Sequence, residues 1–180
     1  MDMVSLISPA TLGDWVRLYL LYIQAFPESE RKPWGMICNM YRKGKTDIWC
    51  LWHDGKFAGL AITINSPDVI LLDYFAICKD RRGQGIGTAA LKAILEKYRD
   101  KGLFLEIEST LEPTPEQPMR LRRKKFYLSC GLQEMHTTAY LFGVKMELLG
   151  LGCHLNFAQY KAFMVDNYNS WVGSNITPSD

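Results

Sequence analysis

The chain has 180 residues, of which 48% are hydrophobic and 22% are charged. This is enough apolar material for one packed core and too little length for two large domains, so we predict a single domain over residues 1–180. The 21 Lys and Arg residues against 19 Asp and Glu residues leave a formal net charge of +2, which argues against sequence-independent binding of nucleic acid.

The sequence also argues against a membrane-spanning protein, an exported protein and a metal-binding protein. No apolar run approaches the roughly 20 residues that a membrane-spanning helix needs, and the N-terminus lacks the basic region of a signal peptide. The 5 Cys are scattered and the 3 His are isolated from one another, so no metal site is predicted. We therefore expect a cytoplasmic protein with no membrane partner.

The first third of the chain predicts a strand followed by two helices. Thr11 or Asp14 can cap the first helix, Pro27 ends it, and Pro33 suits the start of the second. In chain order the expected elements are a strand at 4–7, a helix at 15–26, a charged loop at 28–32 and a helix at 33–41.

The middle of the chain predicts four strands and one helix. Asp54-Gly55 lies between two alternating runs and is typical of a hairpin turn. The nearly continuous apolar run at 69–78 predicts a central strand, and the strand-helix-strand order that begins with it is where a parallel pairing is expected. The expected elements are strands at 48–53, 57–64 and 69–78, a helix at 85–98 and a strand at 103–108.

The last third is more irregular. Pro113, Pro115 and Pro118 predict a stiff linker, and the polar tail from Gly173 is expected to be loose. Between them the pattern predicts a helix at 119–129, one or two strands within 133–149 and a helix at 157–168.

The most informative segment runs from Asp80 to Thr88, between a buried strand and a helix. Glycine lets the backbone turn tightly and approach a ligand, and the N–H groups of a helix's first turn form an anion site. Arg82 could add a charge-assisted contact, as could Arg81 if it points inward. This arrangement predicts a site for a pyrophosphate.

The same residues permit a second reading. The segment that begins at Gly85 also fits a dinucleotide-binding fingerprint, with Glu106 or Glu108 about 20 residues further on to hold a ribose. Against it, an antiparallel hairpin precedes the segment and only one strand-helix-strand unit is visible. A glycine turn that binds nothing is a third alternative.

The segment resembles the signature Arg/Gln-x-x-Gly-x-Gly/Ala of the GNAT superfamily of acyl-CoA N-acyltransferases, matched here by Arg82, Gly85 and Gly87. The segments 71–77, 105–108 and 123–132 are similar to that family in the expected order. The resemblance covers roughly residues 55–140. It implies an α/β (α+β) fold with a mixed, mostly antiparallel central sheet, a parallel β-α-β unit at 69–108 and flanking helices.

The resemblance also implies an activity. The chain would be an acetyltransferase that moves the acetyl group of acetyl-CoA to a primary amine by direct attack in a ternary complex. The acceptor would be a small-molecule or peptide amine, and the loop at 28–32 falls where the family usually builds its acceptor site. A catalytically silent CoA-binding or sensor domain is an alternative, and a homodimer is left open.

The family implies roles for particular residues. Backbone groups of Ile77 and Cys78 would bind pantetheine, and one N–H would polarise the thioester carbonyl. Tyr127 matches the tyrosine that faces the CoA sulfur and would be the acid, since an ordinary pKa near 10 keeps it protonated; ordinary core packing is the alternative. The full predicted cofactor site is Ile77, Cys78, Arg82, Gly83, Gln84, Gly85, Ile86, Gly87, Thr88 and Phe126.

The general base is left open between Asp73, Glu106 and Glu108, which lie on the central strands. A carboxylate between apolar neighbours has a raised pKa that suits a base, but a salt-bridged structural carboxylate looks the same in a sequence. These residues could equally anchor a cationic acceptor. The basic run at 120–125 is interpreted as a solvated helix face, with contact to the phosphates of CoA as the alternative.

Overall fold

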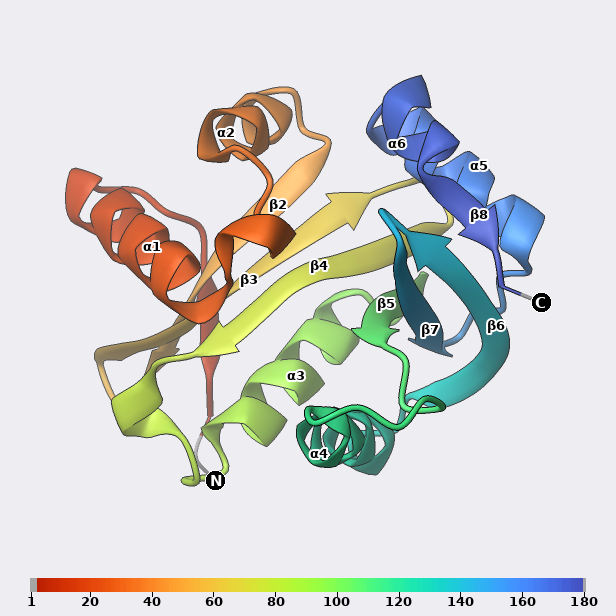
Figure 1. The fold of residues 1–180 in the computed structure, drawn as a ribbon. Helices are drawn as coiled ribbons and strands as arrows, with labels where there is room; N and C mark the ends of the chain where they lie inside the picture. The colour runs from red at the N-terminus through yellow and green to blue at the C-terminus, as the bar shows by residue number, and fades with distance from the viewer. Residues whose placement is uncertain (1–2, 180) are drawn as a thin grey trace. The chain divides into compact units, whose positions relative to one another are not determined.

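The computed structural model describes residues 3–179, which form two compact units (Figure 1). The first unit contains the described residues of 1–65 and 71–99, and the second contains those of 66–70 and 100–180. Within the described residues no helix is both long and apolar enough to cross a membrane.

The first unit is a sheet covered by helices on both faces. Its strands follow the order β1-β2-β3-β4, and β1 and β3 are both antiparallel to β2. Figure 1 shows α1 and α2 on one face and α3 on the other. The elements are β1 (Ser5–Ile7), α1 (Leu12–Ala25), the single turn η1 (Glu28–Glu30), α2 (Trp34–Arg42), β2 (Thr46–His53), β3 (Lys56–Asn65), β4 (Val69–Ile77), the single turn η2 (Lys79–Arg81) and α3 (Ile86–Lys97).

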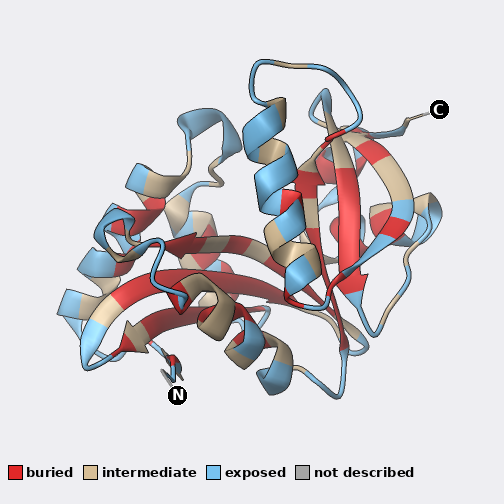
Figure 2. Ribbon diagram, turned by 90° about the horizontal axis from the view of Figure 1, so that it is seen from below, coloured by how far each residue is buried: buried red, intermediate tan, exposed pale blue. Residues whose placement is uncertain are grey.

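The core of the first unit follows from side-chain periodicity. Leu18, Leu21 and Tyr22 form the apolar stripe of α1 and pack against alternate residues of the strands, such as Ile48 and Ile62. Burial is greatest along the strands, and exposed residues gather on the outer faces of the helices (Figure 2). The strands therefore form the buried centre of this unit.

The second unit is an antiparallel sheet with helices. Its strands follow the order β5-β7-β6-β8, and each neighbouring pair is antiparallel. Phe104 of β5 packs edge-on against Phe163 of α5, with ring centroids 5.0 Å apart. The elements are β5 (Gly102–Glu108), α4 (Gln117–Ser129), β6 (Gln133–Leu141), β7 (Val144–Leu151), α5 (Phe157–Asn167), α6 (Ser170–Ser174) and β8 (Ile176–Pro178).

The fold class expected from the sequence is confirmed, with strand, helix and strand in order over 69–108 and a mostly antiparallel arrangement flanked by helices. Thr11 caps α1 in a capping box with Asp14, as expected.

Two regions differ from expectation. Pro118 lies in the first turn of α4 rather than in the linker, because its fixed φ angle suits that position. The tail from Gly173 is partly ordered, because β8 pairs with β6.

Gly59 marks a close approach between two strands of the first unit. A Cβ atom added at Gly59 of β3 would lie 2.3 Å from the carbonyl oxygen of Ala76 on β4. Backbone atoms of a paired strand cannot move aside without breaking the pairing. A side chain at Gly59 is therefore excluded by space.

We predict that Gly59→Ala lowers the free energy of unfolding by about 2 kcal/mol, because it overpacks a buried strand. The matched control is Gly35→Ala on α2, where an added Cβ meets nothing within 4 Å. That control should raise the free energy of unfolding by up to about 1 kcal/mol, since alanine favours helix. Urea unfolding measures both, and equal effects of the two substitutions would contradict the packing argument.

Candidate active site

β4 leads through a short glycine-containing loop to α3. After η2, Gly83 and Gly85 adopt positive φ angles of 76° and 77°. A side chain is strained in this left-handed conformation, whereas the space around both glycines is open. Glycine is therefore needed for backbone conformation, and the open side of the loop is accessible to a ligand.

The start of α3 completes an anion site. No side chain caps the first turn of this helix, so the N–H groups that follow Gly85 are available at the positive end of the helix dipole. Arg82 donates a hydrogen bond from Nε to the carbonyl oxygen of Ile77 at 3.0 Å. Its terminal guanidinium nitrogens make no hydrogen bond to any residue of 3–179. The predicted cofactor residues from Ile77 to Thr88 are thus close together in the first unit.

An open groove of about 580 Å³ lies beside this loop within the first unit. Arg17 and Leu21 of α1, Phe57 of β3 and Cys78 contribute to its lining. Burial raises the pKa of the Cys78 thiol, which therefore stays protonated at neutral pH. The groove offers a binding surface and no thiolate nucleophile at Cys78.

Asp73 of β4 is held by the charged loop between α1 and α2. Lys32 donates from Nζ to the two carboxylate oxygens of Asp73 at 2.7 and 2.9 Å, and the Asp73 side chain is 4% exposed. Both oxygens of the Asp73 carboxylate are therefore engaged by the Lys32 ammonium group. Asp73 therefore fits an anchor better than a base.

Two tyrosine hydroxyls fix the same loop. Tyr22 donates to the carbonyl oxygen of Lys32 at 2.9 Å, and Tyr74 donates to the carbonyl oxygen of Glu30 at 2.9 Å while accepting from the Lys32 N–H at 3.0 Å. Burial raises the pKa of Tyr22 to about 12 and also raises the pKa of Tyr74. Both hydroxyls keep their protons, so the loop at 28–32 remains attached to α1 and β4.

Glu106 and Glu108 lie on β5 in the second unit and have different partners. Tyr160 of α5, which is fully buried, donates its hydroxyl to Glu106. Arg120 of α4 forms an ion pair with Glu108, with Nε 3.0 Å from Oε2, although the N–H does not point at the carboxylate well enough for a hydrogen bond. Glu106 is thus bound by a neutral donor and Glu108 by a cation.

Tyr127 lies near the C-terminal end of α4. Its hydroxyl makes no hydrogen bond within the described residues, and burial raises the pKa of Tyr127 to about 12. The ring of the predicted cofactor residue Phe126 lies 5.2 Å from the Tyr127 ring, centroid to centroid. A protonated phenol with an uncommitted hydroxyl can donate to a leaving group.

The basic run at 120–125 is divided between two faces of α4. Arg122, Arg123 and Lys125 are exposed, which fits the predicted solvated face. Arg120 and Lys124 instead point inward and contact carboxylates. Their spacing of four residues, which places side chains on one helix face, was the signal available in the sequence.

No group of three or more His, Cys, Asp or Glu residues within 3–179 could hold a metal ion.

Comparison with known families identifies one match. The family model described as "Acetyltransferase (GNAT) family" matches residues 15–131. No curated protein matches the chain.

Solved structures share the fold. A Bacteroides thetaiotaomicron protein assigned to the GNAT family superposes with a TM-score of 0.77 at 18% identity, covering 94% of this chain and 98% of that one. A GNAT acetyltransferase of Elizabethkingia anophelis with acetyl-CoA bound gives 0.60 at 16% identity, covering 84% and 99%. The ribosomal-protein-S18-alanine N-acetyltransferase of Escherichia coli gives 0.55 at 21% identity, covering 86% and 96%.

Proposed function

Since the chain belongs to the GNAT family of acetyltransferases, we propose that it transfers the acetyl group of acetyl-CoA to a primary amine. The observation that carries the proposal is the loop between β4 and α3. Gly83 and Gly85 hold it in a left-handed conformation, and it places uncapped N–H groups beside Arg82. Backbone donors, a helix dipole and a guanidinium together favour the binding of a pyrophosphate.

In the proposed reaction the amine attacks the thioester carbonyl directly. Backbone N–H groups at the end of β4 stabilise the developing oxyanion, and the raised pKa of Cys78 argues against a covalent acyl-enzyme at that residue. Tyr127 gives its proton to the departing CoA sulfur as the carbon–sulfur bond breaks. Phe126 would lie beside the cofactor.

We assign the general base to Glu106. Lys32 binds both oxygens of Asp73 and Arg120 forms an ion pair with Glu108, whereas Glu106 accepts a hydrogen bond from the Tyr160 hydroxyl. Glu106 would take a proton from the acceptor's ammonium group, and the neutral amine that results would attack the thioester carbonyl. Asp73 would instead fix the acceptor loop through Lys32.

The alternative of a nicotinamide dinucleotide site is less well supported. Such a site needs an extended parallel sheet. β1 and β3 each pair antiparallel with β2, and β5 and β6 each pair antiparallel with β7. We therefore treat NADH as the competing ligand in the first experiment.

We predict that acetyl-CoA stabilises the protein against heat and that NADH does not. Ligand at about 100 times its Kd adds roughly 2.7 kcal/mol to the free energy of unfolding, a clear rise in Tm for a chain of this size. Gly85→Ala should weaken acetyl-CoA binding by about tenfold, because a Cβ at positive φ displaces the loop.

The matched control for this experiment is Gly44→Ala. Gly44 also has a positive φ angle, of 69°, and open surroundings, but it lies between α2 and β2 rather than in the loop. The two variants should have similar Tm values without ligand. A rise in Tm with NADH alone, or equal loss of acetyl-CoA binding in both variants, would overturn the assignment.

We predict that Tyr127→Phe lowers kcat by about 100-fold and leaves the Kd for acetyl-CoA unchanged, because it removes a general acid and nothing from the phosphate site. Since the pKa of Tyr127 is about 12, the loss should be the same at every pH from about 6 to 10. Thiol release with a panel of primary amines measures kcat. A kcat within twofold of wild type would remove Tyr127 from the mechanism.

We predict that Glu106→Gln lowers kcat by about 100-fold and abolishes the acidic limb of the pH–rate profile, since the base is lost. Asp73→Asn and Glu108→Gln are the matched comparisons, because each also neutralises one strand carboxylate. Both should retain the acidic limb. If the limb disappears in either of them and persists in Glu106→Gln, the base is assigned to the wrong residue.

A further inference from the structure

The helix that carries Tyr127 buries none of its apolar side chains fully. Of the 13 residues of α4, Lys124 is the one that is buried, and Met119 and Leu121 are half exposed, at 52% and 48%. The helix therefore lacks the continuous apolar stripe that usually fixes a surface helix. Some other interaction must determine its rotation and position.

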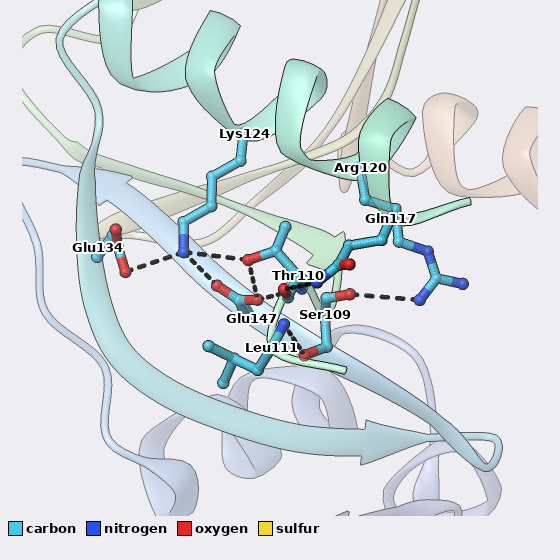
Figure 3. A network of polar contacts seen from close by, with 8 residues as sticks. All are labelled: Ser109, Thr110, Leu111, Gln117, Arg120, Lys124, Glu134 and Glu147. Atoms are coloured by element: carbon cyan, nitrogen blue, oxygen red, sulfur yellow. Dashed lines mark hydrogen bonds and ion pairs between the residues drawn. The ribbon is translucent and has the colours of Figure 1, made fainter. Parts of the chain in front are cut away.

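Lys124 supplies that interaction (Figure 3). Its Nζ lies 2.5 Å from Glu147 Oε2, 3.0 Å from Glu134 Oε2 and 3.4 Å from Thr110 Oγ1. Glu147 also accepts hydrogen bonds from the N–H and, at 2.8 Å, from the hydroxyl of Thr110. One ammonium thus joins α4 to β7, to β6 and to the segment after β5.

Both partners of the buried pair are charged. Burial alone would lower the pKa of Lys124, but hydrogen bonds to Glu147 and Glu134 outweigh it and raise that pKa. Burial would likewise raise the pKa of Glu147, but bonds from Lys124 and Thr110 lower it. A buried charged pair with several directional bonds has one favourable geometry, unlike an apolar contact that can slide.

The same face of α4 makes two more contacts to the end of β5. Gln117 Nε2 donates to the carbonyl oxygen of Thr110 at 3.1 Å, and Arg120 Nη1 donates to that of Ser109 at 3.3 Å. Gln117, Arg120 and Lys124 are three and four residues apart, so they form one stripe, and Tyr127 follows after three more residues. The stripe ends at the predicted acid.

We propose that Lys124, bound to Glu147 and Thr110, is a positioning residue that fixes the rotation of α4 and thereby the location of the Tyr127 hydroxyl. The expected effect on catalysis rests on the proposed acetyl transfer. The expected effect on the position of α4 rests on the contacts of Lys124. A proton donor must be held within about 0.5 Å of its productive position, so a loosened α4 would lose most of the benefit of Tyr127.

The test compares Lys124→Met with Lys125→Met. Lys125 is the next residue on α4 and is exposed, so its variant controls for the loss of one charge on this helix. Lys124→Met should lower kcat at least about tenfold with an unchanged Kd for acetyl-CoA, and Lys125→Met should change neither. Lys124→Arg, which keeps the charge, should recover part of kcat.

Coupling to Tyr127 separates positioning from general stability. In a Tyr127→Phe background, Lys124→Met should have almost no further effect on kcat, because it acts through a hydroxyl that is already absent. The double variant Lys124→Met/Glu147→Leu also removes the Glu147 charge, which Lys124→Met leaves buried without its lysine. Its Tm should therefore be nearer wild type than that of Lys124→Met, while kcat stays low. Additive losses, or a kcat that recovers together with Tm, would overturn the proposal.

A second readout does not depend on activity. In protein labelled with ¹³Cζ-tyrosine, the Tyr127 resonance, assigned with Tyr127→Phe, should shift in Lys124→Met and stay in place in Lys125→Met. If wild type releases no thiol with any amine, the proposed function fails while this spectrum still tests the positioning. An unshifted Tyr127 resonance in folded Lys124→Met would contradict the inference by itself.

Discussion

A carboxylate on a buried strand costs free energy unless a donor reaches it, and this requirement determines how several peripheral elements attach to the strands. Asp73 on β4 is bound by Lys32 of the loop between α1 and α2. Glu106 on β5 is bound by Tyr160 of α5, and Glu147 on β7 by Lys124 of α4. In each case the polar pair favours one orientation of the attached element.

The chemistry of each donor has a functional meaning. A lysine pairs its carboxylate with a charge, which suits a structural anchor, whereas a phenol hydroxyl donates a neutral hydrogen bond. Glu106, the proposed base, and Glu147, the partner of the positioning residue Lys124, are both glutamates. They differ in the side chain that binds each of them. α5 lies outside the residues matched by the family model, yet it supplies the partner of Glu106.

Features that depend on neighbouring residues could be predicted from the sequence, whereas contacts between residues far apart in the chain could not. The cap at Thr11, the Asp54-Gly55 turn and the glycine loop from Gly83 to Gly85 each depend on neighbours in the chain, and all were predictable. Lys32 and Asp73 are 41 residues apart and neither has an unusual local context, so their pairing was not. The two faces of the basic run on α4 became distinguishable only once Glu147, 23 residues beyond Lys124, was placed beside it.

The attachment of the loop at 28–32 through Tyr22, Tyr74 and Lys32 has a thermodynamic consequence for recognition. A segment with two of its backbone carbonyls and its one ammonium already bonded has less conformational freedom to lose when a molecule binds against it. Ordering of the segment would then subtract little from affinity, and discrimination among molecules would depend on the fit to a preorganised surface. Such a surface would bind ligands of a narrow range of shapes.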